Sequence, residues 1–297
     1  MRYLIIISML VLNSVTSAQD VKNIEGTNFG KYVEQYSKGR DQYAPEMVEY
    51  LAHLVDNRYA SVLDVGCGTG IATRQLKPYF PRVKGLDIDK AMLKEAKRIE
   101  KMNTGTGRSI KYFQADVAKK LPFKDKQFDL ITICEAFHWL VKNEETKKAA
   151  LAELYRVLKP GGILAIVHSG FELEKDPFSV AKKSVSDDVH KKYTKVQALH
   201  PKSGNSAYNP LNVLQEFNFQ TPQGEKIFSH KVMTDIEKEI ARVQSASKWN
   251  EIDSKDQPAA LQEYRERMVE IFKQFGSEQI TKNAYNKMYI GKRPVQE

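Results

Sequence analysis

Val62-Leu63-Asp64-Val65-Gly66-Cys67-Gly68-Thr69-Gly70 is the stretch of this 297-residue sequence that decides its fold. An apolar, β-branched run leads into glycines at alternate positions, and the residues from Ile71 onward (IATRQL) are typical of a helix. Because glycine lacks a Cβ atom, such a loop lets the backbone approach a ligand closely, and the N–H groups of the following helix point at that ligand. The stretch therefore predicts a strand, a tight loop and a helix beside a ligand site.

A second acidic segment follows about 20 residues later, as nucleotide-type sites require. Val83-Lys84-Gly85-Leu86-Asp87-Ile88-Asp89 predicts a short strand that ends in a carboxylate. In a parallel sheet Asp87 would lie beside the glycine loop, where it can accept both hydroxyls of a ribose. The ligand need not be a dinucleotide, because a pyrophosphate binder prefers G-x-G-x-x-G and this loop reads G-x-G-x-G.

Residues 62–70 and 83–89 together resemble the S-adenosyl-L-methionine site of class I methyltransferases. Two further segments match in the same order, namely Ala115-Asp116-Val117 after a predicted strand, and the run FDLITI at residues 128–133. The resemblance covers roughly residues 29–170. It implies a methyltransferase with S-adenosyl-L-methionine as cofactor, on a Rossmann-like α/β fold. That fold has seven strands in a mostly parallel sheet with an antiparallel last strand, and here a helical insertion near the C-terminus.

The same resemblance orders the rest of the chain. Glu153–Leu158, Lys159-Pro160-Gly161-Gly162 and Ile163–Val167 are similar to the family's helix, turn and fifth strand. After Gly170 the alternation stops, and residues 172–225 are predicted to be irregular because prolines and glycines break any long helix. Strands are expected at 226–230 and 280–291, and helices at 235–243 and 259–275. The helices within 233–275 would form an insertion over the mouth of the active site.

The predicted fourth strand ends at Cys134-Glu135-Ala136-Phe137-His138-Trp139. Ligands bind beyond the carboxyl ends of the strands in an open parallel sheet, so this hexapeptide is expected beside the transferred methyl group. His138 is the candidate catalytic residue, which would position the acceptor or take its proton; packing against the cofactor edge is the alternative. Phe137 and Trp139 are expected to contact the substrate. Glu135 is either a solvated charge or a polar contact.

An N-terminal lid is a further expectation. Tyr36-Ser37-Lys38-Gly39-Arg40-Asp41-Gln42-Tyr43 is similar to the Tyr-x-x-x-Arg-Pro-x-Tyr-Pro pattern of relatives of trans-aconitate methyltransferase. In those relatives the segment touches the cofactor carboxylate and the substrate, which implies these roles for Arg40 and Tyr36. Both prolines of the pattern are replaced here, by Asp41 and Ala44. A surface salt bridge is the alternative for Arg40.

The predicted cofactor-binding residues belong to the glycine loop, the two acidic strand ends and the lid. They are Asp64, Gly66, Cys67, Gly68, Gly70, Asp87, Ile88, Asp116, Val117 and Arg40. No set of histidine, cysteine and carboxylate residues has the spacing of a metal site. Cys67 and Cys134 are expected to be neighbours, and to act as small apolar side chains rather than as a redox pair.

Length and charge set wider bounds. The length suits one domain with an insertion, or one and a half domains. The net charge of +9 favours a lysine-rich solvated surface, with attraction of acidic substrates as the sharper alternative. The clustered lysines near residues 182–195 lack an accompanying nucleic-acid motif, so nucleic acid is not an expected partner. The sequence does not determine the oligomeric state.

The first 18 residues resemble a secretory signal peptide, with residues 19–28 as a polar linker. Tyr3–Leu12 is too short for a comfortable transmembrane span, although an uncleaved anchor is an alternative. Secretion conflicts with the use of S-adenosylmethionine, which is made in the cytosol, so the compartment stays open. The remaining units are a core with its lid at 29–170 and a C-terminal part with substrate-capping helices at 171–297.

These observations predict transfer of a methyl group to a small molecule, with a carboxylate or hydroxyl oxygen as the acceptor. C-methylation of a quinone- or sterol-like precursor is the enzymatic alternative. A non-catalytic, secreted cofactor-binding protein and a tRNA methyltransferase are two further alternatives. The Asn-Pro-Pro-Tyr motif of many amino-group methyltransferases does not follow the fourth strand, which disfavours N-methylation of nucleobases or glutamine.

Overall fold

The computed structural model describes residues 28–57, 59–103, 109–173, 176–194 and 208–295. Their centre is a seven-stranded sheet with the order β3-β2-β1-β4-β5-β7-β6. β7 runs antiparallel to both of its neighbours, and the pairs among β1 to β5 are parallel. The strands are β1 Ser61–Val65, β2 Arg82–Asp87, β3 Lys111–Gln114, β4 Phe128–Cys134, β5 Leu158–Phe171, β6 Glu225–Thr234 and β7 Ile280–Lys292. The predicted fold class is confirmed.

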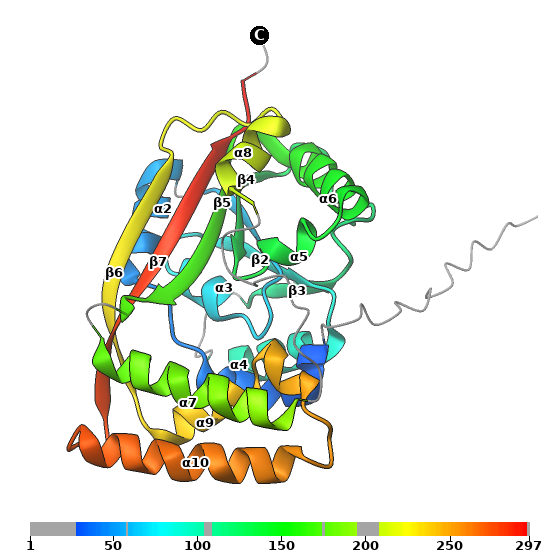
Figure 1. Ribbon diagram of the computed structural model, residues 1–297. Helices are drawn as coiled ribbons and strands as arrows, with labels where there is room; N and C mark the ends of the chain where they lie inside the picture. Colours follow the sequence, from blue (N-terminus) through cyan, green and yellow to red (C-terminus); the bar gives the residue numbers. More distant parts are fainter. Residues whose placement is uncertain (1–27, 58, 104–108, 174–175, 195–207, 296–297) are drawn as a thin grey trace, which may run out of the picture.

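Helices cover both faces of the sheet (Figure 1). Their bounds are η1 Asn28–Tyr32, α1 Val33–Gly39, α2 Pro45–Val55, α3 Ile71–Leu76, α4 Lys90–Asn103, α5 Phe137–Leu140, α6 Glu144–Val157, α7 Pro177–Tyr193, α8 Pro210–Glu216, α9 Ile236–Gln244, η3 Ser247–Glu251 and α10 Gln257–Gln274. One apolar cluster joins the sheet to α2 and α3, and another joins it to α6 and α8. β4 is almost wholly apolar because a central parallel strand is buried on both faces.

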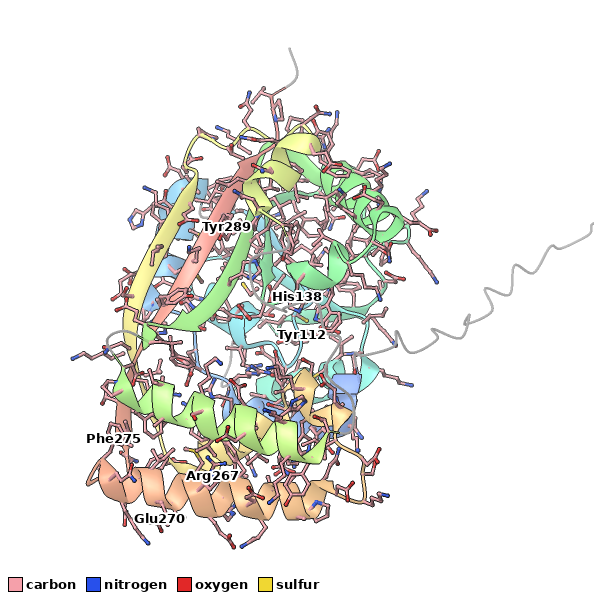
Figure 2. All side chains as sticks on the ribbon, viewed as in Figure 1. Tyr112, His138, Arg267, Glu270, Phe275 and Tyr289 are labelled. Atoms are coloured by element: carbon pink, nitrogen blue, oxygen red, sulfur yellow. The ribbon has the colours of Figure 1, made fainter. Side chains whose placement is uncertain are left out.

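A separate helical layer, formed by α7, α9, η3 and α10, lies beyond the end toward which the β5 arrow points (Figure 1). It has its own apolar cluster, which includes Phe178, Trp249, Tyr264 and Met268. Arg267 of α10 donates a hydrogen bond of 2.7 Å to Asp188 of α7, and Glu270 projects from the outer side of the layer (Figure 2). The helices expected within 233–275 are therefore present at the end of the sheet where ligands bind. Their predicted role as a substrate cap stays a prediction.

One prediction about this layer is wrong. Residues 172–225 are expected to be irregular, but Pro177–Tyr193 forms the 17-residue helix α7, and Pro210 begins the short helix α8 instead of breaking a helix. The Asp176 side chain accepts a hydrogen bond from the Ser179 N–H, and Pro177 occupies the first turn, where its missing N–H costs nothing. The helix-breaking residues that motivated the expectation begin at Pro201, after the helix has ended.

The segment Lys159–Gly162 is also not a free turn. It lies inside β5, where Phe128 pairs with Leu158 and Leu130 already pairs with Ile163, so the extra residues bulge out of the strand. Gly161 has a φ of +76°, which favours glycine, and its N–H donates to the Arg293 carbonyl oxygen at 2.9 Å. The fifth strand consequently starts five residues earlier than the sequence suggested, because the backbone of Arg293, which directly follows β7, supplies partners for the bulge.

The signal-like segment 1–18 lies outside the described residues, as does the predicted linker except for Asn28, which begins η1. Within the residues that are described, none of the helices combines the length and the apolar character that a membrane crossing requires.

Candidate functional site

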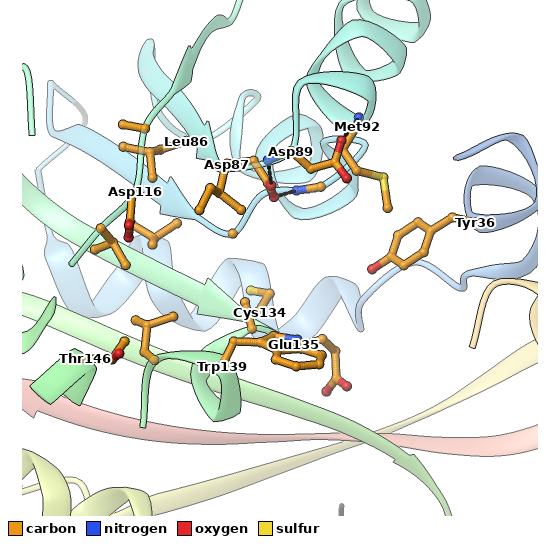
Figure 3. Close-up of a pocket in the computed structure, with 18 residues that line it drawn as sticks. Tyr36, Leu86, Asp87, Asp89, Met92, Asp116, Cys134, Glu135, Trp139 and Thr146 are labelled. Carbon is orange, nitrogen blue, oxygen red and sulfur yellow. Dashed lines mark hydrogen bonds between the residues drawn. The ribbon is translucent and has the colours of Figure 1, made fainter. Parts of the chain in front are cut away.

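A cavity lies at the carboxyl ends of β1, β2 and β4 (Figure 3). It encloses about 960 Å³, counting its opening to solvent. Many predicted site residues line it, namely Tyr36, Gly66, Gly68, Asp87, Ile88, Asp116, Val117 and Trp139. A smaller cavity of about 280 Å³ behind the glycine loop shares Tyr36, Gly66 and Cys134, and is also lined by the predicted residues Asp64 and Cys67. Most of the residues that were predicted from their spacing in the sequence to bind the cofactor thus lie around these two cavities.

The glycine loop forms one wall of the larger cavity. Gly66 and Gly68 have φ angles of +66° and +52°, a region that side chains rarely adopt. A Cβ atom at Gly66 would lie 2.4 Å from the Cβ of Ala136, so this glycine lets the loop pack against the start of α5. A Cβ atom at Gly68 would meet only the Tyr36 ring, at 3.8 Å, and would fill space between the loop and that ring. The absence of a side chain at Gly68 therefore keeps the space between the loop and the Tyr36 ring open.

Gly70 serves packing instead of lining either cavity. Its φ is +81°, and a Cβ atom there would lie 2.6 Å from the Tyr112 hydroxyl and 2.8 Å from Nη1 of Arg74. The third glycine of the motif thus allows α3 and β3 to approach each other.

Asp87 is fixed at the end of β2. Its Oδ2 accepts the Gly68 N–H at 2.7 Å, and its Oδ1 accepts the Asp89 N–H at 2.8 Å. Only 9% of the residue is exposed, and burial, with a contribution from Asp89, raises its pKa to about 6. Each carboxylate oxygen has a second lone pair, so the carboxylate can still accept hydroxyl groups of a ligand that lies over the loop.

Asp64 is buried within the strands instead of facing the larger cavity. Thr73 of α3 donates its hydroxyl to Oδ2 at 2.6 Å, and Thr132 of β4 donates to Oδ1 at 2.9 Å. The residue therefore joins β1, β4 and α3, while one side of it faces the smaller cavity. Burial raises its pKa from 3.8 to about 6 despite these two hydrogen bonds.

Replacing Asp64 by asparagine should change how stability depends on pH. The folded protein holds a proton on Asp64 between pH 4 and 6 that the unfolded chain has released, so its stability falls as the pH rises through this window. An asparagine at this position does not titrate, and the variant should gain about 2 to 3 kcal/mol on the wild type between pH 4 and 7. Urea unfolding of both proteins at these two pH values measures the difference. An equal difference at both pH values would show that Asp64 titrates normally.

Asp116 and Val117 line the side of the cavity next to β3. The Asp116 side chain accepts the Ala118 N–H at 2.9 Å, which fixes the turn after the strand. Apolar side chains that the sequence reasoning did not single out complete this wall, namely Leu86, Met92 and Leu140. The arrangement suits a flat ring with a polar edge.

The opposite end of the cavity carries Glu135, Trp139 and Tyr36 (Figure 3). Glu135 follows β4 with a φ of +57°, and its carboxylate accepts the backbone N–H of Ser169. Partial desolvation raises the pKa of the Glu135 carboxyl, and the charge of Arg40 opposes this shift. Sequence reasoning left the role of Glu135 open, and its position at the end of the fourth strand was the signal that could have selected it.

Besides Gly70, three predicted site residues do not line either cavity. Phe137 is fully buried in the core, with its ring centroid 5.7 Å from that of Tyr208. His138 is exposed on α5, 4.9 Å from the Trp139 ring by centroids (Figure 2). Arg40 lies behind Tyr36, with its guanidinium 4.7 Å from the ring centroid and Nη2 donating to the Ser245 carbonyl oxygen at 3.3 Å. Their proposed roles stay predictions.

Cys67 and Cys134 are both free, buried thiols that line the smaller cavity. Burial raises the pKa of each thiol well above its ordinary value, so neither is an activated nucleophile. The described ranges contain no cluster of three or more histidine, cysteine or carboxylate residues that could hold a metal ion.

The region that forms the site is similar in sequence to known methyltransferases. The sequence profile of a family described as "Methyltransferase domain" matches residues 63–166. The chain is 33% identical over 137 residues to malonyl-[acyl-carrier protein] O-methyltransferase of Enterobacter lignolyticus, covering 46% of this chain and 50% of that protein. It is 40% identical over 113 residues to the ubiquinone/menaquinone biosynthesis C-methyltransferase UbiE of Stutzerimonas stutzeri, covering 36% and 40%. The matches thus span half or less of these two relatives.

A solved structure described as a type II methyltransferase from Anaeromyxobacter dehalogenans has a TM-score of 0.59. The match covers 86% of this chain and 98% of that one at 16% sequence identity. At this identity the likeness concerns the fold.

Proposed function

We propose that this chain, which carries a class I S-adenosylmethionine-dependent methyltransferase domain, methylates an oxygen of a small-molecule acceptor. One observation carries the proposal. The glycine loop and Asp87 form one wall of a cavity that continues past Cys134 to Glu135 and Trp139. A nucleoside held at the loop would therefore point its reactive end toward the residues that follow β4.

The residues present fit this cofactor. Gly68 leaves a space that its own Cβ would fill, Asp87 offers carboxylate lone pairs beside it, and Asp116 follows an apolar wall. Asp87 would bind the ribose hydroxyls, and Asp116 the amino edge of the base. These assignments agree with the residue types that such a ligand requires.

When bound, S-adenosylmethionine supplies a sulfonium methyl group, and its transfer is an in-line displacement. The protein has to align the acceptor with that methyl group and exclude water, which is where most of the rate enhancement of such a transfer arises. Tyr36 and Trp139 enclose the acceptor end of the cavity from α1 and α5. The cavity lining does not include His138, Phe137 or Arg40. These residues would therefore act on the acceptor or the cofactor only through other residues that line the cavity.

Oxygen is the proposed acceptor atom, at a carboxylate or a hydroxyl group. One relative named above is an O-methyltransferase and another a C-methyltransferase. C-methylation of a quinone-like precursor is therefore the second candidate. Acidic acceptors agree with the net charge of +9, whereas the carboxylates that line the cavity favour neutral ones.

Calorimetric titration with S-adenosylmethionine, followed by assays of S-adenosylhomocysteine release over carboxylic acids, phenols and quinols, tests the proposal. Binding together with release on an oxygen acceptor is expected. Binding without release on any acceptor would instead favour a non-catalytic cofactor-binding protein. RNA binding that weakens steeply with salt would favour a tRNA methyltransferase.

Replacing Asp87 by alanine should weaken S-adenosylmethionine binding by about 1 to 3 kcal/mol, because ribose hydroxyls lose a charged acceptor. Calorimetry measures this loss. Asp125→Ala is the matched control, since Asp125 is an exposed carboxylate just before the start of β4, whereas the cavity lies at the other end of that strand. Equal affinities of the wild type and the Asp87 variant would refute the assignment of the ribose site.

A further inference from the structure

We propose that Glu135 is the general base of the reaction and that the acceptor is a hydroxyl group, such as a phenol or enol, rather than a carboxylate. This inference rests on the proposed function and names its substrate class. It rests on the backbone conformation of Glu135, its attachment to β5 and the charges around it.

The backbone of Glu135 is strained where it meets the cavity. Four non-glycine residues in the described part of the chain have a positive φ, and all of them, Glu135, Asp56, Lys126 and Asn218, lie in connections between elements. Glu135 alone among these four lines the cavity. Such conformations persist only where the surrounding structure imposes them, and they concentrate at functional sites.

Two hydrogen bonds to β5 impose this conformation. The Glu135 N–H donates to the Val167 carbonyl oxygen at 2.9 Å, and its Oε1 accepts the Ser169 N–H. Both partners belong to the end of the neighbouring strand, so backbone and carboxylate are held by one rigid element. In the proposed step the other oxygen, Oε2, takes the proton of the acceptor.

Several charged and titratable groups act on this carboxylate. Desolvation raises the pKa of Glu135, whereas the Ser169 N–H and the positive charge of Arg40, which lies behind Tyr36, lower it by less. The tyrosine hydroxyls of Tyr36, from α1, and Tyr208, from the segment before α8, have pKa values that Glu135 raises further. A carboxylate with a raised pKa is a stronger base for a hydroxyl proton than one in water.

The acidic residues that line the cavity favour a neutral acceptor over a carboxylate. Asp87, Asp89, Asp116 and Glu135 all line it, so a carboxylate acceptor would meet like charges. A carboxylate acceptor also needs no base, which would leave Glu135 without a role. A neutral amine loses its proton only after the methyl group has been transferred, so it too needs the base less than a hydroxyl does. Glu135 and His138 are both exposed residues, but only Glu135 lines the cavity.

The proposed step is balanced. Glu135 takes the hydroxyl proton while the acceptor oxygen forms a bond to the methyl carbon. The carbon–sulfur bond breaks, and its electron pair stays on the sulfur, which becomes neutral. Glu135 then releases the proton to solvent, and no oxidant or further reactant is required.

The test uses the full chain with catechol and 4-nitrophenol as hydroxyl probes, and benzoate and benzylamine as comparison acceptors. Glu135→Gln should lower kcat with catechol by about 10² to 10⁴-fold, the range for loss of a general base. The KM for catechol should change by less than about threefold, because the amide can still accept a hydrogen bond. Calorimetry should show unchanged S-adenosylmethionine affinity, and catechol binding should persist in the presence of S-adenosylhomocysteine.

Two further readouts separate a base from a structural residue. The loss should be much smaller with 4-nitrophenol, which ionises more readily and needs the base less, and the acidic limb of the pH–kcat profile should disappear. Glu135→Asp should keep more activity than Glu135→Gln, since it retains a carboxylate. Glu278→Gln, which neutralises an exposed carboxylate between α10 and β7, is the matched control and should behave as the wild type.

Different results overturn different parts of the proposal. Transfer to benzoate or benzylamine but not to the phenols would refute the hydroxyl class. An equal loss of kcat with both phenols, or a loss produced by His138→Gln and not by Glu135→Gln, would refute the role of Glu135. If the wild type methylates no acceptor in the panel but binds the cofactor, the proposed function fails, and the inference fails with it.

Discussion

Replacing Glu239 by glutamine should lower the free energy of unfolding by about 3 to 5 kcal/mol, the cost of leaving a buried charge without its partner. Glu239 is fully buried, and its Oε1 accepts hydrogen bonds of 2.6 Å from both Lys282 and Thr234. Lys182 lies 3.2 Å from Oε2. These cations hold the pKa of Glu239 well below its ordinary range, although burial alone would raise it.

The large loss of stability that we expect for Glu239→Gln arises mainly at Lys282. It is fully buried as well, and burial has already lowered its pKa to about 8. Without Glu239 it must either carry an unpaired charge or lose its proton. Lys182, Lys282 and Arg242 also surround the Phe171 ring, at 4.8, 4.4 and 5.5 Å, so three cations would remain close together.

Urea unfolding measures the loss, and Glu237→Gln is its matched control. Glu237 lies on the same helix, its side chain is 72% exposed, and its pair with Arg265 should contribute at most about 1 kcal/mol. The double variant Glu239→Gln, Lys282→Met should regain much of the stability, because it removes the unpaired charge. Similar losses for the Glu239 and Glu237 variants would contradict this account of the ion cluster.

The second large effect is expected for Gly66→Ala. Its φ of +66° costs an L-residue about 1 to 2 kcal/mol. In addition, the new Cβ would lie 2.4 Å from the Cβ of Ala136, and such overpacking costs about 1 to 3 kcal/mol. A total loss of about 2 to 5 kcal/mol is expected from these two terms. Cofactor affinity should fall as well, since the loop can relieve the contact only by moving away from α5.

The variant Gly276→Ala separates the conformational cost of a positive φ from the cost of overpacking. Gly276 also has a φ of +66°, but a Cβ atom there would meet nothing within 4 Å. This variant should therefore show the conformational cost alone, about 1 to 2 kcal/mol, with unchanged cofactor binding. Unfolding experiments and calorimetry on both variants make the comparison. Equal losses would mean that the close contact with Ala136 is relieved at no cost.

The cofactor wall was predictable because its information is local. Gly66, Gly68 and Asp87 were selected from short segments whose spacing implies a strand, a loop and a parallel neighbour. The parallel register then places Asp87 beside the loop, where it accepts the Gly68 N–H. Hydrophobic pattern and glycine positions determine such a unit with little help from the rest of the chain.

The acceptor end was less predictable because consecutive residues there point in different directions. The expected hexapeptide does follow β4, but α5 turns Phe137 into the core and leaves His138 exposed. Glu135 lines the cavity in a left-handed conformation that a hydrogen bond to β5 supports. Nothing in the local sequence specifies this conformation, since a glutamate usually avoids it.

By itself, the sequence determined the alternation of strands and helices, the glycine loop and the acidic strand ends, because backbone geometry and side-chain periodicity act over a few residues. Tertiary structure alone decided which of the residues after β4 reaches the cavity. It also paired Glu239 with Lys282, 43 positions away, and Arg242 with Asp41, 201 positions away. Such contacts depend on how distant elements pack, because a charged side chain is stable in the interior only when its partner lies beside it.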